Sequence, residues 1–268
     1  MENISVAVIG YGNLGSSIVK GLVRSQKIDP SNITATRHRP LEGKTTNYLG
    51  INVSNDNVAA VKASDIIIIA VKPYRVKSVV EEIAPALDPK KHVLVSVASG
   101  VTIADILGFL KTEDLPVFRA MPNIAAAVGE SMTCISAHAS TKEQSALVQE
   151  IFDQSGETLL INEELMDAAT VLGACGTAYV LRFIRGMMQG GIQIGFSSHD
   201  ARKIALQTVK GAAELLISNG KHPEEEIDSV TTPKGCTIAG LNEMEHQGFS
   251  SSLIRGIVTS YEDILKSK

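Results

Sequence analysis

Aromatic side chains are scarce in this sequence. Tryptophan is absent, and six Phe and five Tyr make up only 4% of the 268 residues. Sites that stack nucleic-acid bases need aromatic platforms, so this class of site is disfavoured. A basic excess is also missing, because 25 Lys and Arg stand against 29 Asp and Glu, a formal net charge of −4. Proteins that bind nucleic acid or anionic membranes usually carry the opposite balance, and we expect neither partner.

Cysteines and long apolar runs are few as well. Three cysteines, an odd number in a chain of this length, are typical of reduced thiols rather than of a disulfide framework. The longest strongly apolar run, Ile66–Val71, is far shorter than the roughly 20 residues of a membrane helix. The N-terminal segment carries Glu2 where a secretory signal has a short basic segment, so we expect no secretory signal. A cytoplasmic enzyme is expected.

The first part of the chain alternates between short apolar runs and segments with a helical rhythm. The runs are Ile4–Ile9, Ile33–Thr36, Ile66–Val71, Val93–Val97, Pro116–Met121 and Met132–Ser136. The clearest helical segments are Leu14–Ser25, Tyr74–Leu87, Ile103–Leu110 and Lys142–Ser155. This alternation predicts an α/β domain with a largely parallel, doubly wound sheet of the Rossmann type, in which Ile66–Ile69 is a central strand. The length predicts two domains, the first over residues 1–162.

From Glu163 to the end, runs of β-branched residues give way to helical patterns. The predicted helices are Glu163–Gly173, Thr177–Phe196, His199–Asn219, Pro223–Val230, Thr237–Gln247 and Ser250–Lys266. We therefore predict an all-helical second domain over residues 163–268. No low-complexity linker separates it from the first domain, so a tight junction is expected.

Four glycines recur within the second predicted helix of this domain, at Gly186, Gly190, Gly191 and Gly195. Each glycine inside a helix costs about 0.5–1 kcal/mol relative to alanine, so the repetition requires a reason. Close approach of another helix is the natural one. That helix belongs either to the same subunit or to a second subunit, and we favour the subunit interface.

A glycine motif follows the first predicted strand directly and opens the first predicted helix. The residues are Gly10, Tyr11, Gly12, Asn13, Leu14 and Gly15, which match G-x-G-x-x-G. In such a motif Gly10 permits the tight turn, Gly12 lets the backbone approach a pyrophosphate, and Gly15 lets the helix pack on the strand. The motif is weak by itself, but its context of strand and helix favours dinucleotide binding over a plain glycine-rich turn.

The end of the second predicted strand bears on which dinucleotide is bound. NAD sites usually place a carboxylate there, but the segment ITATRHR has none before Glu42. Arg37 and Arg39 instead offer two cations, which suit the 2′-phosphate of NADP. We favour NADP over NAD, with two solvated surface arginines as the alternative. Asn57 is either the N-cap of a short helix or a neighbour of the adenosine.

Two further segments stand where ligands bind in such folds, although their residues leave the role open. Ala70–Pro73 (AVKP) ends the central strand, and Lys72 there is either a ligand contact or a surface lysine. Val230–Leu241 (VTTPKGCTIAGL) places a turn before a helix, where free N–H groups and the Thr237 hydroxyl form either a carboxylate site or an ordinary N-cap. From these residues alone we favour the ordinary N-cap. Six scattered histidines offer no metal-ligand spacing.

Together these segments resemble pyrroline-5-carboxylate reductases. The motifs that carry the resemblance are GYGNLG, AVKP, SVASG (Ser96–Gly100), RAMPN (Arg119–Asn123), ACGTAY (Ala174–Tyr179) and TPKGCTIAGL followed by Gly248–Phe249. They keep the family's order over nearly the full chain. The resemblance implies an NAD(P)-binding Rossmann domain and a helical dimerisation domain that interleaves between subunits, with dimers often assembled into decamers. The implied reaction is NAD(P)H-dependent reduction of 1-pyrroline-5-carboxylate, a cyclic imine carboxylate, to L-proline.

The resemblance also assigns roles by position. It implies cofactor contacts by the glycine motif, by Arg37 at the NADP 2′-phosphate, and by Asn57, Ala70, Val71, Lys72, Pro73, Ser99, Met121 and Pro122. It implies substrate contacts by Asn123, Thr232, Gly235, Cys236 and Thr237. Thr237 is the catalytic candidate, because it would lie near the ring nitrogen that gains a proton. A partner subunit would complete the pocket.

The sequence departs from the family pattern at a few positions. Lys234 stands where the family usually has glycine, and Cys175 and Cys236 fall inside signature segments. Three functions therefore remain open: the proline-forming reductase, a relative that reduces another cyclic imine carboxylate, and a non-catalytic NADP-binding regulatory protein.

Overall fold

The computed structural model describes residues 4–37 and 49–266 of the chain. These residues form two compact units. One runs through Cys175 and includes the chain end from Asp263, and the other comprises Gly176–Glu262. The chain is helical from Glu163 onward, as predicted.

The first unit is built on one eight-stranded sheet. Its order is β3-β2-β1-β4-β5-β6-β7-β8, and all neighbouring pairs are parallel except β6 with β7. The strands are β1 (Val6–Ile9), β2 (Ile33–Thr36), β3 (Asn52–Ser54), β4 (Ile66–Ile69), β5 (Val93–Ser96), β6 (Val117–Met121), β7 (Ser131–His138) and β8 (Gly156–Leu160). The predicted α/β class with a mostly parallel sheet is confirmed.

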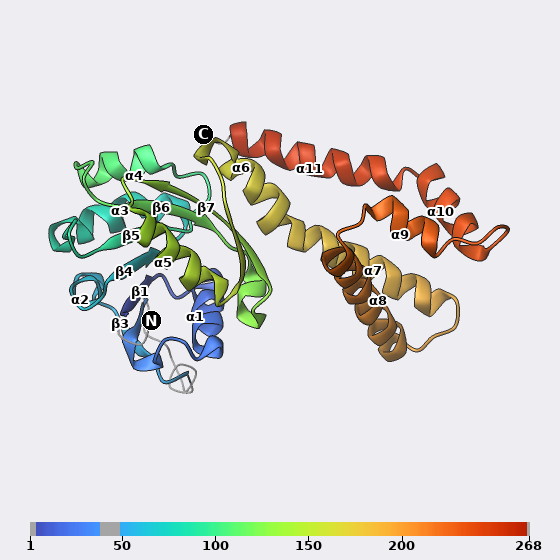
Figure 1. The fold of residues 1–268 in the computed structure, drawn as a ribbon, viewed down its shortest axis with the longest axis horizontal. Coiled ribbons are helices and arrows are strands. Elements are labelled where there is room, and N and C mark those ends of the chain that lie inside the picture. Colours follow the sequence, from blue (N-terminus) through green and yellow to red (C-terminus); the bar gives the residue numbers. More distant parts are fainter. Residues whose placement is uncertain (1–3, 38–48, 267–268) are drawn as a thin grey trace. The chain divides into compact units, whose positions relative to one another are not determined.

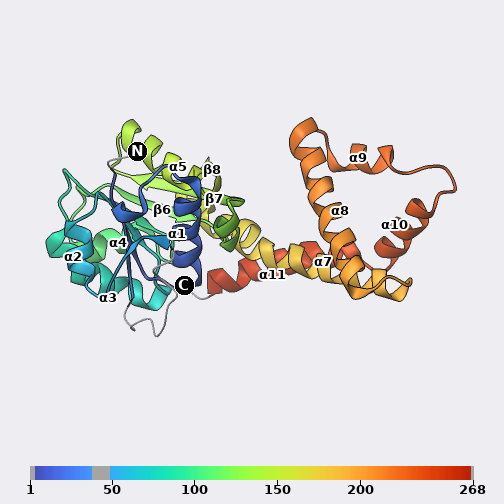
Figure 2. The ribbon, with the colours of Figure 1, turned by 90° about the horizontal axis from the view of Figure 1, so that it is seen from below.

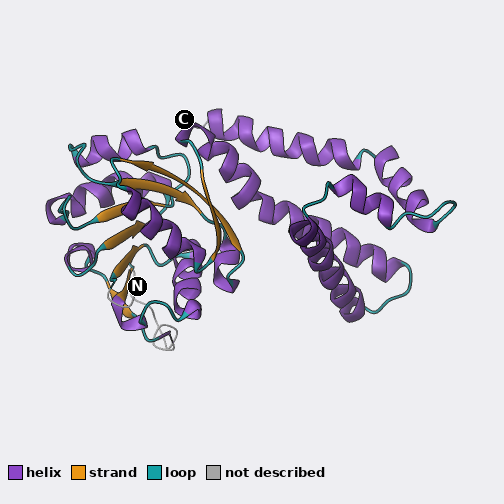
Figure 3. Ribbon diagram, in the orientation of Figure 1, coloured by secondary structure: helices purple, strands orange, loops and turns teal. Residues whose placement is uncertain are grey.

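Helices cover both faces of this sheet (Figure 1, Figure 3). The helices are α1 (Asn13–Ser25), α2 (Asn57–Lys62), α3 (Pro73–Ile83), α4 (Ile103–Leu110) and α5 (Lys142–Asp153). Ile66 and Ile68 of β4 pack with α1 and α5, whereas Ile67 and Ile69 pack with α2, α3 and α4. All four isoleucines are buried, so β4 is the central strand that its unbroken apolar run predicts.

Two strands were absent from the sequence prediction, and both lie at the ends of the sheet. β3 is polar and mostly exposed, and β8 has no buried residue. An edge strand needs apolar side chains less than a central one does, so neither segment carries the run of buried residues that marks the other strands. The reversal of β7 relative to β6 was also not predicted.

The helical region begins with three short pieces where one helix, Glu163–Gly173, was predicted. A 3₁₀ turn (Glu163–Leu165) leads into α6 (Met166–Ala169) and then into a π-helical segment (Thr170–Cys175). The remaining helices are α7 (Gly176–Gln193), α8 (Ser198–Asn219), α9 (Pro223–Ser229), α10 (Cys236–His246) and α11 (Phe249–Lys266) (Figure 2). None of the helices in the described ranges is long and apolar enough to span a membrane.

The unit Gly176–Glu262 has almost no core of its own. Only Ala201 and Ala205 are buried within it, whereas Ile194 is 78% exposed and Ile217 73% exposed. The helices touch at a few places, such as Phe183 against Phe249, with ring centroids 6.0 Å apart. A helical unit that leaves its large apolar side chains in water needs a further surface to cover them.

Gly186, Gly190 and Gly191 lie inside α7, whereas Gly195 lies beyond its end, and the structure explains them separately. A Cβ on Gly191 would lie 3.0 Å from the Ala201 side chain, so this glycine permits the contact between α7 and α8. Gly195 has a φ of +114°, which few other residues adopt. A Cβ on Gly186 or on Gly190 would meet no atom of a neighbouring element within 4 Å, so packing within this chain does not account for these two glycines.

Candidate active site

The glycine motif makes a tightly packed turn between β1 and α1. Gly10 has a φ of +108°, and a Cβ there would lie 2.6 Å from the Ala70 carbonyl oxygen. A Cβ on Gly15 would overlap the carbonyl oxygen of Gly10. Both positions therefore require glycine for the close approach of β1, α1 and the end of β4.

Gly12 differs from its two partners because it faces open space. Apart from the adjoining backbone, a Cβ at this position would meet no protein atom within 4 Å. Gly12 is also the N-cap of α1, and no side chain accepts a hydrogen bond from the first N–H groups of that helix. The turn thus leaves an uncapped helix N-terminus beside an uncovered backbone, an arrangement that fits a pyrophosphate.

The flanking residues of the motif bind it to the sheet. The N–H groups of Gly10 and Tyr11 donate to the carbonyl oxygen of Thr36 at 3.1 Å and 2.9 Å. The Asn13 carbonyl oxygen accepts from the Ser17 hydroxyl at 2.8 Å, and Leu14 packs partly buried against the core. The loop is therefore held by the last residue of β2.

Arg37 follows β2 at the same edge of the sheet. Its N–H donates to the Ser54 carbonyl oxygen at 3.0 Å, and its side chain is exposed. The position is open to a phosphate at the end of the second strand. Arg39 and Glu42 lie outside the described residues.

The interpretation of Asn57 as an N-cap is wrong. Asp56 caps α2, because its carboxylate accepts from the Ala59 N–H at 2.9 Å. Asn57 is the first residue of the helix, and its side chain instead bonds to Thr36 and Glu82. The alternative, a place near the adenosine, is compatible with its position beside the end of β2.

The AVKP segment supplies a second uncapped helix N-terminus at this edge. The Ala70 N–H donates to the Ile9 carbonyl oxygen at 2.8 Å, and Val71 would contact a Cβ on Gly10. Lys72 is the N-cap of α3 and makes no side-chain capping bond, and Pro73 is the first helical residue. Proline suits this position because it has no N–H to leave unpaired. The Lys72 side chain is exposed.

The RAMPN segment is buried and hydrogen-bonded to an extent that its sequence does not indicate. Met121 and Pro122 are buried, and Asn123 is 9% exposed. The Asn123 amide oxygen accepts from the Ala125 N–H at 2.9 Å, and its nitrogen donates to the Gly173 carbonyl oxygen at 3.2 Å. Asn123 therefore ties the end of β6 to the π-helical segment. Ser99 is exposed in the loop after β5.

Arg119 is a buried charge to which the sequence motifs assigned no role of its own. Its side chain is only 2% exposed, and it forms ion pairs with Glu163 at 3.1 Å and Asp167 at 4.0 Å. Glu163 also accepts from the Ile103 N–H at 2.7 Å. An arginine in the middle of an otherwise apolar strand was the available signal, because a buried charge needs a partner.

In the helical unit, the TPKG segment forms a β-turn that leads into α10. The Gly235 N–H donates to the Thr232 carbonyl oxygen at 2.9 Å, and Lys234 has a φ of +59°. A Cβ on Gly235 would lie 2.5 Å from the Thr232 hydroxyl oxygen, so this position also requires glycine. Gly235 is the N-cap of α10 and has no side chain with which to cap it.

The interpretation of the TPKG segment as an ordinary N-cap is wrong, because its N-cap residue, Gly235, has no side chain that could accept a hydrogen bond. Cys236 and Thr237 are the first two helical residues, both exposed, and their backbone lies at a helix start that no side chain caps. Such a start attracts carboxylates. The structure therefore gathers the predicted residues into two groups, one in each compact unit: the edge of the sheet, and the turn at α10.

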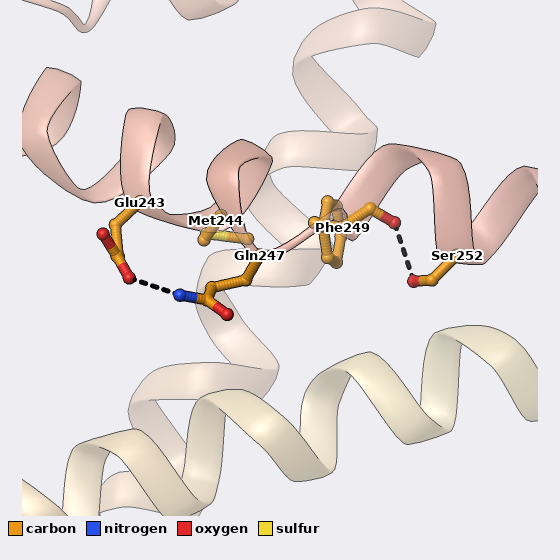
Figure 4. Close-up of a pocket in the computed structure, with 5 residues that line it drawn as sticks. All are labelled: Glu243, Met244, Gln247, Phe249 and Ser252. Atoms are coloured by element: carbon orange, nitrogen blue, oxygen red, sulfur yellow. Dashed lines mark hydrogen bonds between the residues drawn. The ribbon is translucent and has the colours of Figure 1, made fainter.

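A hollow of about 350 Å³ lies near the junction of α10 and α11 and contains none of the predicted site residues. Its lining residues are Glu243, Met244, Gln247, Phe249 and Ser252 (Figure 4). Gln247 turns its amide nitrogen to the Glu243 carboxylate at 2.8 Å, which leaves a largely apolar floor. The hollow is part of the exposed apolar surface of the unit Gly176–Glu262, to which Met244 and Phe249 contribute.

Two family models match the chain. Residues 163–266 match pyrroline-5-carboxylate reductase dimerisation, and residues 5–100 match NADP oxidoreductase, coenzyme F420-dependent. Pyrroline-5-carboxylate reductase 2 of Dictyostelium discoideum is 43% identical over 100% of this chain and 94% of its own length. The chain belongs to the pyrroline-5-carboxylate reductase family.

Other relatives agree with this assignment. Pyrroline-5-carboxylate reductase 1 of Dictyostelium discoideum is 42% identical over 95% of this chain, which spans 48% of that longer relative. The crystal structure of Plasmodium falciparum pyrroline carboxylate reductase with NADP bound superposes with a TM-score of 0.89, at 27% identity, over 98% of both chains. The predicted family and the predicted oxidoreductase class are thus confirmed. The family's dimerisation region makes the chain part of a homo-oligomer.

Proposed function

We propose that this pyrroline-5-carboxylate reductase family member reduces the C=N bond of 1-pyrroline-5-carboxylate with NADPH, which yields L-proline. The observation that carries the proposal is the conjunction of full-length membership in the family with an open, uncapped dinucleotide turn at Gly12. The net reaction consumes the imine, NADPH and one proton. Proline biosynthesis is the role that follows.

The residues at the edge of the sheet would hold the dinucleotide. Gly12 and the N-terminus of α1 offer backbone N–H groups to the pyrophosphate, and the N-terminus of α3 at Lys72 and Pro73 offers a second set. Arg37 would pair with the 2′-phosphate, which favours NADPH over NADH. Ser99, Met121 and Pro122 would border the nicotinamide.

When bound, the reduced nicotinamide supplies the hydride that reaches the imine carbon. The chain's own task is to hold that carbon in line and to favour the protonated imine nitrogen. The turn Thr232–Gly235 and the uncapped start of α10 would bind the substrate carboxylate through N–H groups and the helix dipole. Asn123 in the first unit and Cys236 in the second are further substrate contacts that we propose.

Thr237 would act at the ring nitrogen as the nitrogen gains its proton. Its hydroxyl is exposed at the second position of α10, where it is free of an N-cap role. A hydroxyl can both donate and accept, so it can stabilise the nitrogen before and after protonation. Thr237→Ser retains this group, whereas Thr237→Val has the same shape without it. We expect kcat to fall at least about tenfold in Thr237→Val and much less in Thr237→Ser.

The direct test is the initial rate of reduced-nicotinamide oxidation by the purified protein with pyrroline-5-carboxylate. NADPH and NADH are compared in parallel, and proline formation is measured in the same samples. Proline-forming turnover supports the proposed reaction, and a higher rate with NADPH than with NADH supports the proposed cofactor. Binding of NADPH without turnover would instead support the regulatory alternative.

A related cyclic-imine carboxylate is the second candidate substrate, and Lys234 is the observation that favours it. This residue brings a cation and a positive φ to the turn that would hold the substrate carboxylate. Competition between the five-membered substrate and a six-membered piperideine carboxylate distinguishes the two candidates. An unchanged preference in Lys234→Gly would make the lysine incidental to substrate choice.

The assembly that we propose is a homodimer whose helical domains interleave, with a decamer as the larger form. The exposed Ile194 and Ile217, together with the open positions Gly186 and Gly190, supply apolar surface and room for a second copy's helices. The molar mass in solution tests this proposal. A monomer at micromolar concentration would contradict it.

We also place the functional boundary between cofactor domain and dimerisation domain at 162/163, where the helical pattern begins. The cytoplasm is the compartment that we propose. The three cysteines, Cys134, Cys175 and Cys236, are all unpaired with one another, which suits a reducing compartment.

A further inference from the structure

A chain of three polar side chains links β2, α2 and α3 at the proposed adenosine end of the site. The Thr36 hydroxyl lies 2.6 Å from the Asn57 amide oxygen. The Asn57 amide nitrogen lies 3.2 Å and 3.1 Å from the two carboxylate oxygens of Glu82. Helices α2 and α3 lie side by side in the first unit, which brings Glu82 within reach (Figure 1, Figure 2).

The direction of these hydrogen bonds is set by Glu82. An ionised carboxylate only accepts, so the Asn57 nitrogen has to face Glu82. The Asn57 oxygen then has to face Thr36, and the Thr36 hydroxyl has to donate its proton to it. Without the carboxylate, no charged group fixes the orientation of the Asn57 amide. Either the amide oxygen or the amide nitrogen could then face the Thr36 hydroxyl, which can both donate and accept a hydrogen bond.

The other end of this chain is the residue that holds the glycine motif. Thr36 is 1% exposed, and its carbonyl oxygen accepts from the N–H groups of Gly10 and Tyr11. The next residue is Arg37, the proposed 2′-phosphate ligand. The Glu82 carboxylate therefore acts directly on Asn57 and, through Asn57, on the strand end from which the cofactor loop and Arg37 extend.

We propose that Glu82 is a positioning residue that sets the affinity for NADPH by fixing the amide of Asn57. This inference rests on the proposed cofactor role of Asn57. Glu82 itself does not need to touch the cofactor. Its contribution is made by an acceptor oxygen, so an uncharged acceptor at the same place retains part of it.

The test is the dissociation constant of NADPH, measured by titration calorimetry on the full-length protein. Glu82→Ala is expected to raise it about five- to tenfold, the size of one typical net hydrogen bond. Glu82→Gln retains an acceptor oxygen and is expected to recover at least half of that loss on a logarithmic scale. Glu81→Ala is the matched control, because Glu81 is the exposed neighbour on the same helix, and it should bind like the wild type.

Kinetics separate positioning from a general structural effect. Glu82→Ala should raise the KM for NADPH and leave both kcat and the KM for the imine substrate within about twofold of wild type. In an Asn57→Ala background, Glu82→Ala should cause no further loss, because its effect passes through the missing amide. An equal loss in both backgrounds, or a Glu82→Ala protein that binds like Glu81→Ala, would overturn the inference.

Failure of the proposed function would look different. A wild-type protein that neither binds NADPH nor turns over would refute the cofactor assignment itself. A wild-type protein that binds and turns over while Glu82→Ala behaves normally would refute only the role of Glu82.

Discussion

Arg119 Nη1 lies 3.1 Å from Glu163 Oε1, and this ion pair joins the buried strand β6 to the first turn of the helical region. The arginine is almost fully buried, whereas the glutamate retains one-third of its exposure. The same carboxylate oxygen accepts from the N–H of Ile103 at the start of α4. Glu163 thus links the first turn of the helical region to both α4 and β6.

Glu163→Ala is therefore expected to destabilise the protein. The change leaves a buried guanidinium with less compensation and removes the acceptor at Ile103, so the free energy of unfolding should fall by about 1.5–3 kcal/mol. Urea unfolding at one protein concentration measures this change. Glu164→Ala, its exposed neighbour, should stay within about 0.5 kcal/mol of wild type. Equal stabilities of the two variants would contradict the role given to the ion pair.

Gly12→Ala is expected to separate cofactor binding from folding. Its Cβ would enter open space, so the melting temperature should be close to that of wild type. The same methyl group would stand where the pyrophosphate approaches the backbone, so the KM for NADPH should rise at least about tenfold. Gly15→Ala should instead destabilise the fold, because its Cβ would overlap the Gly10 carbonyl oxygen. A Gly12→Ala enzyme with normal NADPH affinity would remove Gly12 from the binding site.

Arg37→Ala is expected to weaken NADPH much more than NADH. The guanidinium would contact only the 2′-phosphate that NADH lacks, so the ratio of the two KM values should change at least about tenfold. Steady-state kinetics with both cofactors measures that ratio. Lys20→Ala removes an exposed cation from α1 and should leave the ratio unchanged. Equal effects of Arg37→Ala on the two cofactors would defeat the assignment.

Lys234 holds a backbone conformation that costs an L-residue about 1–2 kcal/mol. Lys234→Gly should relieve that cost and raise the free energy of unfolding by about 0.5 kcal/mol, after the greater freedom of glycine in the unfolded chain is subtracted. Lys234→Val should lower it by at least about 1 kcal/mol, since β-branched residues tolerate a positive φ poorly. The order Gly, Lys, Val in urea unfolding checks the turn geometry. A valine variant as stable as wild type would contradict it.

His92 is expected to make the protein less stable in mild acid. Burial lowers the pKa of His92 below its usual 6.5, with a further contribution from the charge of Lys91. The unfolded chain takes up this proton near pH 6.5, whereas the folded chain does so only at lower pH. The stabilisation from a neutral His92 is therefore fully present above pH 6.5 and is lost as the pH falls below it.

His92→Asn removes this titration while retaining an oxygen that can accept from the Asp88 N–H, which now donates to His92 Nδ1 at 2.8 Å. The free energy of unfolding, followed from about pH 7.5 to about pH 5.5, should fall less steeply in this variant than in wild type. An unaltered slope in His92→Asn would assign the acid sensitivity to other groups.

Much of the architecture follows from the order of residues alone. Ile66–Ile69 predicts a strand buried on both faces, and the glycine spacing of Gly10, Gly12 and Gly15 predicts a dinucleotide turn. These signals are local, because the burial of a strand and the tightness of a turn impose requirements on the residues within them. Motif order along the chain added the family, which the relatives confirm.

Tertiary structure decided what depends on partners distant in the sequence. The polar edge strand β3 carries no apolar run, and its pairing with β2 is visible only in the folded sheet. Asn57 has the sequence position of a cap, yet the fold places it between Thr36 and Glu82. Arg119 and Glu163 are 44 residues apart, and only the folding of the first unit brings their charges together. Local sequence determined the elements and the glycine turn of the site, whereas hydrogen bonds and ion pairs across the fold decided which polar side chains hold that site in place.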